Sequence, residues 1–160
     1  MELNIRIAKV RELPSHNAIN RWELMRYDGS PITVYIRSRF HAIPAGHSVA
    51  LTLTAVYYYY RSQMRHNLVE YPVEVTFEID PYTSLASDTE DEIELPPRIM
   101  TMMYSVAIGA LRGMLAQKAA NTPLRDYPLP IVNVSELVSR HLYGSPSPDR
   151  TIPLVDYIYN

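Results

Sequence analysis

The side chains that could do chemistry are few and scattered along this sequence. His41 and His47 flank a loop that contains Pro44 and Gly46, and two histidines with a carboxylate can hold a metal ion. No third ligand stands at a suitable spacing, and the chain has no cysteine. It also lacks a glycine-rich phosphate loop, a nucleophile elbow and a paired-histidine helix motif. We therefore expect no metal, no cofactor and no catalytic residue, and we rank an enzyme or small-ligand protein lowest.

Aromatic and methionine side chains offer apolar contact instead. A run of four tyrosines over residues 57–60 points two rings to each side of an extended strand. Such rings serve either as core packing or, where exposed, as contact area for a partner. Met100 and Met103 lie in an apolar helical segment, and methionine adapts to irregular surfaces. Both features fit either an ordinary core or a surface that binds polypeptide.

Small residues recur along the same helical segment. Ser105, Gly109 and Gly113 stand four apart and so share one helix face. A glycine inside a helix costs about 1 kcal/mol relative to alanine, so it usually has a packing reason. The close neighbour is either the sheet or the same helix of a second subunit. Because the segment is apolar nearly all round, one sheet leaves a side uncovered, and we expect a homo-oligomer, either a dimer or a tetramer.

Charge is distributed unevenly along the 160 residues. The segment 66–95 holds nine Asp or Glu and no Lys or Arg, although the net charge of the chain is only −2. Glu70, Glu74 and Glu78 form a row on one strand face, which is either a solvated face or a docking site for a basic partner. No long basic block exists, so we expect no nucleic-acid binding.

The apolar pattern predicts one α+β domain over residues 1–143, because strands are followed by helices. We expect a four-stranded antiparallel sheet, then a long helix, a proline-rich linker, a short helix and an irregular tail over 144–160. In that tail, Leu154, Val155 and Ile158 could dock and plug a groove. The strands are expected over 3–10, 32–40, 48–61 and 68–79, the helices over 98–118 and 134–143, and the linker over 119–132.

The amino terminus shows no apolar stretch of signal-peptide length. The longest strongly apolar run without a charge, residues 99–111, is 13 residues long, whereas a membrane span needs about 20. We therefore expect a cytoplasmic protein with no membrane insertion.

The carboxy-terminal half resembles the SecB family of export chaperones. The likeness lies in the Pro96-Pro97 opening of the helix, in Pro123-Leu124, and in the linker that ends in residues 127–133, Tyr-Pro-Leu-Pro-Ile-Val-Asn. The resemblance implies a tetramer that binds unfolded polypeptide in apolar grooves and takes part in protein export. It also implies docking of the acidic sheet face to the secretion motor ATPase, without catalysis or cofactor.

Carried onto this chain, the resemblance gives a set of residues that would bind polypeptide. An alternative is a dedicated single-partner protein on the same fold, either a chaperone that guards an antitoxin or an adaptor of a secretion or mobile-element machine. The expected groove residues are Leu124, Tyr127, Leu129, Ile131 and Val134, with Met100, Met103, Tyr57 and Tyr59 as further candidates.

Overall fold

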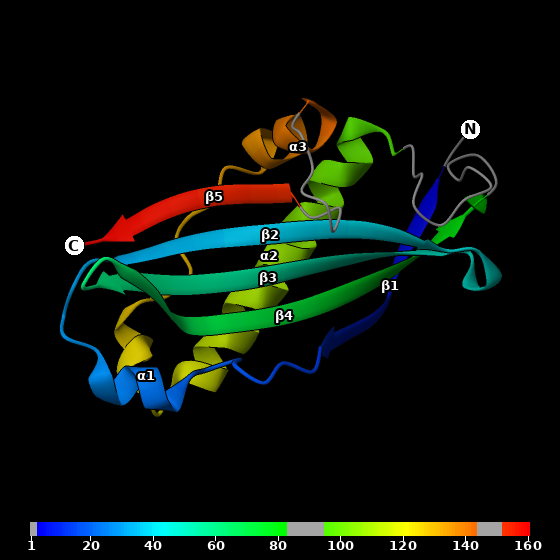
Figure 1. Ribbon diagram of the computed structural model, residues 1–160. Coiled ribbons are helices and arrows are strands. Elements are labelled where there is room, and N and C mark those ends of the chain that lie inside the picture. Colours follow the sequence, from blue (N-terminus) through cyan, green and yellow to red (C-terminus); the bar gives the residue numbers. More distant parts are fainter. Residues whose placement is uncertain (1–2, 83–94, 144–151) are drawn as a thin grey trace.

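A five-stranded antiparallel sheet covered on one face by a long helix forms the molecule (Figure 1). The computed structural model describes residues 3–82, 95–143 and 152–160. The strand order across the sheet is β1-β4-β3-β2-β5. The strands are β1 (Asn4–Glu12), β2 (Ile32–Ile43), β3 (Ser48–Arg61), β4 (Met64–Asp80) and β5 (Ile152–Tyr159), and the helices are α1 (Arg21–Arg26), α2 (Pro97–Ala119) and α3 (Val134–Tyr143), with the short 3-10 helices η1 (Pro44–Gly46) and η3 (Pro123–Asp126).

The hairpin of β3 and β4 is the centre of the sheet. Its tip is a two-residue turn in which Ser62 and Gln63 both have positive φ, of 53° and 65°. A left-handed conformation at both central positions matches the right-handed twist of the strands that the turn joins. The period-two pattern then places the odd-numbered residues of β3 on the buried side, and Leu51, Leu53 and Tyr57 are at most 1% exposed.

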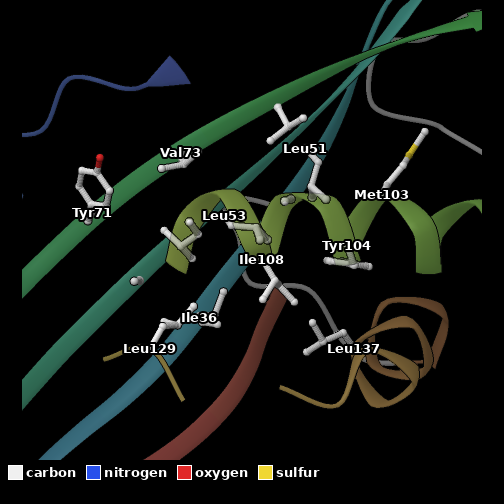
Figure 2. Packing of buried hydrophobic residues seen from close by; sticks show 14 of the residues in the cluster. Ile36, Leu51, Leu53, Tyr71, Val73, Met103, Tyr104, Ile108, Leu129 and Leu137 are labelled. Atoms are coloured by element: carbon white, nitrogen blue, oxygen red, sulfur yellow. The ribbon is translucent and has the colours of Figure 1, made fainter. Parts of the chain in front are cut away.

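Helix α2 packs across this buried side. Pro97 opens the helix, where the missing amide hydrogen costs nothing. Figure 2 shows Met103, Tyr104 and Ile108 of α2 among the core side chains of the sheet. The hydroxyls of Tyr104 and Ser38 share a buried hydrogen bond of 2.9 Å. By length and composition alone α2 could cross a membrane, yet nine of its residues are buried in this core.

The linker and α3 are fastened to α2 and to the core. Arg112 of α2 donates through Nη2 to the carbonyl of Pro130 at 2.9 Å. Asn133 caps α3, because its Oδ1 accepts from the Glu136 amide at 3.3 Å. Leu137 is completely buried and fixes α3 onto the core.

The α+β class, the antiparallel sheet and the long helix are confirmed, as are the predicted bounds of the short helix, 134–143. Strand β3 also has its predicted bounds, 48–61. Helix α1 was not predicted. It has six residues, begins at Arg21 and is capped by Asn20, whose side chain accepts from the Glu23 amide.

The expectation of four strands and an irregular tail is wrong. Residues 152–159 form β5, which pairs antiparallel with the outer edge of β2. The prolines of this segment, Pro153 among them, favoured an irregular tail. An edge strand tolerates proline, however, and the β2–β5 pairing shifts its register between Ile36 and Arg37, where Arg37 lies opposite Pro153. Most of the acidic segment, residues 83–94, and the first part of the tail, 144–151, lie outside the described residues.

Leu137→Ala should lower the free energy of unfolding by about 3 kcal/mol, because it leaves a cavity under α3. Leu142→Ala is the matched control, since Leu142 is 42% exposed on the same helix, and its loss should stay below about 1 kcal/mol. Urea denaturation measures both. Equal losses would contradict the docking of α3 through Leu137.

Candidate apolar binding site

An apolar cavity of about 220 Å³ lies where the linker turns back after α2. Its walls come from the carboxy-terminal part of α2, from the linker with η3, and from β3 and β4. It is lined by Tyr57, Val69, Leu115, Ala116, Ala119, Ala120, Leu124, Arg125, Tyr127, Pro128 and Leu129.

The linker keeps this shape through a few local interactions. Thr122 donates through Oγ1 to the Ala119 carbonyl at 2.9 Å, and the same oxygen accepts from the Leu124 amide at 3.2 Å. Pro123 then opens η3 at the point where α2 has ended. Leu124 and Leu129 are 3% and 4% exposed and anchor the linker in the core. Chain stiffness and two buried leucines therefore hold the cavity wall in place.

Tyr127 is half-buried at the cavity and is supported by β5. The Tyr127 and Tyr159 rings meet edge to face, with centroids 5.3 Å apart. The Tyr159 hydroxyl donates to the carbonyl of Pro128, which also lines the cavity. The carboxy-terminal strand, expected to be an irregular tail, thus supports one wall of the site.

Tyr57 reaches the cavity from the sheet. Its hydroxyl is buried without a hydrogen-bond partner among the described residues. Burial raises the pKa of Tyr57 far above its ordinary value, with a smaller contribution from Tyr159, so the phenol stays neutral. One unpaired polar atom therefore lies beside a mostly apolar space.

The structure brings together part of the predicted groove. Tyr57, Leu124, Tyr127 and Leu129 share the cavity lining. Ile131 is 96% exposed on the linker, and Val134 is half-buried at the start of α3; neither lines the cavity.

Three other predicted groove residues are core residues. Met100 and Met103 are at most 2% exposed in the amino-terminal half of α2, away from the cavity. Tyr59 is fully buried near α1, and its hydroxyl donates to Glu23 at 3.2 Å. Their burial removes them from any surface that this conformation offers to a partner.

Sequence reasoning missed the contribution of α2 to the cavity. Leu115 and Ala119, and likewise Ala116 and Ala120, stand four apart and so face the linker together. Their spacing was visible in the sequence. What was not visible is that the linker returns over this end of the helix.

The predicted oligomer surface is exposed on α2. Ser105, Gly109 and Gly113 all face solvent, and Ser105 donates to the Thr101 carbonyl at 2.7 Å. A Cβ added at either glycine would meet nothing within 4 Å. The sheet is therefore not the close neighbour of these small residues, which leaves this helix face uncovered.

The predicted acidic row is neutralised by arginines. Arg11 of β1 pairs with Glu74, and Arg37 of β2 pairs with Glu70, each with an N···O distance of 2.9 Å. Arg6 of β1 pairs with Glu78. This sheet face is thus a lattice of opposite charges, and docking of a basic partner to it stays a prediction.

Within the part of the chain that the structure describes, no group of three or more His, Asp or Glu side chains could hold a metal ion. His47 stacks on the Tyr82 ring, with centroids 5.7 Å apart.

The fold and the cavity define an α+β protein with an antiparallel sheet, one long covering helix and a small apolar site under a proline-rich linker. No known family model, curated protein or solved structure matches the chain.

Tyr57→Phe should hold the free energy of unfolding or raise it by up to about 1 kcal/mol, because it removes a buried hydroxyl without a partner. Tyr104→Phe is the matched control. It breaks the buried hydrogen bond to Ser38 and should cost about 1 kcal/mol. Urea denaturation of both variants gives the comparison, and a larger loss for Tyr57→Phe would mean that its hydroxyl has a partner.

Proposed function

We propose that this protein is a holdase that binds unfolded or partly folded polypeptide, in the manner of the SecB-type chaperones. One observation carries the proposal: the linker, α2 and the sheet enclose an apolar cavity that includes Tyr57, Leu124, Tyr127 and Leu129. Leu124, Tyr127 and Leu129 belong to the linker on which the SecB resemblance rests, and Tyr57 joins them from β3. The activity would need no cofactor and no catalytic group.

The mechanism would be passive transfer of client side chains out of water. Burying one large apolar side chain is worth about 1.5–3 kcal/mol, which by itself gives only weak binding. A holdase therefore gains from presenting several such sites at once, because each further contact is made at a high effective concentration. Because this cavity gives each chain one such contact, oligomerisation is part of the proposal.

The exposed face of α2 is the surface that we propose for this oligomer. Gly109 and Gly113 would let the backbone of a second α2 approach closely, and no described residue of the chain fills the space beside them. A dimer or tetramer through this face would place several cavities in one particle. Its cellular setting would be the cytoplasm, and its role there would be in protein export.

The size of the cavity favours the alternative of a single dedicated partner. At about 220 Å³ it is below the roughly 300–1,000 Å³ of most small-molecule sites. It fits one side chain better than it fits a long segment. A protein that guards one antitoxin, or that adapts one component of a secretion or mobile-element machine, needs no more than this.

Ala116→Phe should abolish most of the suppression of aggregation. Ala116 is exposed and lines the cavity, so a phenyl ring there would fill the space without disturbing the core. The measurement is light scattering by several denatured clients mixed with stoichiometric protein. Ala45→Phe, at an exposed position of η1, adds the same bulk away from the cavity and should act like the unmodified protein.

Failure of the unmodified protein to slow aggregation of any client would remove the general holdase. Suppression with one client alone would favour the dedicated partner.

Gly109→Leu should shift the solution mass toward the monomer, because its side chain blocks close approach of two helices while having free space in the single chain. Light scattering across a concentration series measures this. Ser139→Leu, at an exposed position of α3, is the control for added apolar surface. An unmodified protein of monomeric mass at every concentration would refute the oligomer.

A further inference from the structure

A cluster of three tyrosines and one arginine lies on the sheet face opposite α2. Tyr58 and Tyr60 point to this face because Tyr57 and Tyr59, their neighbours on β3, point into the core. Arg65 stands opposite Tyr60 in the register of β3 and β4. Tyr35 joins them from β2, between two core residues. We call Tyr35, Tyr58, Tyr60 and Arg65 the Arg65 cluster.

The Arg65 guanidinium is held in one orientation by neutral groups. Its Cζ lies 3.9 Å from the centroid of the Tyr58 ring and 5.3 Å from that of Tyr35. Its Nε donates to Asn67 Oδ1 at 3.0 Å, and one Nη donates to the Tyr35 hydroxyl at 3.1 Å. A guanidinium fixed in this way has already lost much of its rotamer freedom, so a further hydrogen bond costs less entropy.

Arg65 differs from other arginines of the same face in having no carboxylate partner among the described residues. Arg6, Arg11 and Arg37 each form an ion pair with a glutamate of β4. In Arg65, aromatic faces and uncharged oxygens take the place of a carboxylate. Among the side chains that the structure describes, this charge is therefore oriented but not compensated.

Exposed apolar side chains surround this charge. Tyr60 is 57% exposed. Ile158 of β5 is 54% exposed and lies opposite Thr33, which in turn lies opposite Tyr58. Figure 1 places the hairpin tip and the end of β5 at the same end of the molecule. Aromatic and arginine side chains together are a composition that protein interfaces favour.

We propose that the Arg65 cluster docks an acidic segment of a partner protein. A carboxylate of that segment accepts from the free N–H groups of Arg65, and an adjacent apolar side chain lies on Tyr60. This surface faces away from the apolar cavity. It would bind a negatively charged partner, whereas the glutamate row of β4 predicted a positively charged one.

A polypeptide suits this surface better than a nucleic acid does. Base stacking needs an open ring face, but Arg65 already lies over the Tyr58 ring. Arg6, Arg11 and Arg37 of the same sheet face are already paired with glutamates, so they offer no free cations to a phosphate backbone. A single carboxylate at Arg65 meets neither obstacle.

The test uses a short fluorescent peptide in which glutamate alternates with leucine, titrated with the full chain and followed by anisotropy. Arg65→Gln should weaken binding about tenfold, since it removes a charge-assisted hydrogen bond. Arg65→Lys should recover only part of the affinity, because an ammonium lacks the planar fork. Arg98→Gln removes the same charge from an exposed position at the start of α2 and should leave binding unchanged.

A second peptide, with glutamine in place of glutamate, separates the contribution of charge from that of apolar contact. Its affinity for the unmodified protein should be about as low as the affinity of the acidic peptide for Arg65→Gln. Equal binding of the two peptides would overturn the proposal, as would wild-type affinity in Arg65→Gln. Binding of single-stranded RNA that depends on Arg65, without binding of the acidic peptide, would overturn it in favour of a nucleic acid.

Discussion

The burial of one sheet face under α2 is the constraint on which the rest of the structure depends. An antiparallel sheet with apolar residues on one side needs a cover, and α2 supplies it with Met103, Tyr104 and Ile108 (Figure 2). Once α2 lies there, the chain that follows must return over its end. The prolines of the linker keep that return extended, and Leu124 and Leu129 fix it to the core. The apolar cavity is a by-product of this path.

Local patterns in the sequence were enough to predict most elements. The alternation in β3 and the Asn133 cap of α3 are properties of neighbouring residues, so they appear in the sequence directly. Strand β5 could not be found in this way, because its evidence is the free edge of β2, more than a hundred residues earlier in the chain. Helix α1 is only six residues long, and it is stabilised mainly by contacts such as that between Glu23 and Tyr59.

The same distinction, between local patterns and contacts of distant segments, explains which parts of the candidate site and of the sheet surface could be predicted. The linker leucines were predicted because they belong to a motif, whereas Ala116 and Ala120 were missed because only the fold brings the linker above them. Glu74 looked like part of an acidic face because the sequence shows one strand at a time. The sheet places Arg11 beside it from another strand. The net charge of a sheet face therefore depends on how neighbouring strands are paired, and one strand alone does not predict it.

Strand order also bears on how the chain is made. Strand β5 is the last element in the sequence, and it pairs with β2 at the outer edge of the sheet. During synthesis on the ribosome, the hairpin of β3 and β4 can form and α2 can cover it while the backbone of β2 still lacks its outer partner. An unpaired edge is a site where strands of other nascent chains can add. Strand β5 therefore acts as a late seal, because the outer edge of β2 stays open until residues 152–159 have been made and have paired with it.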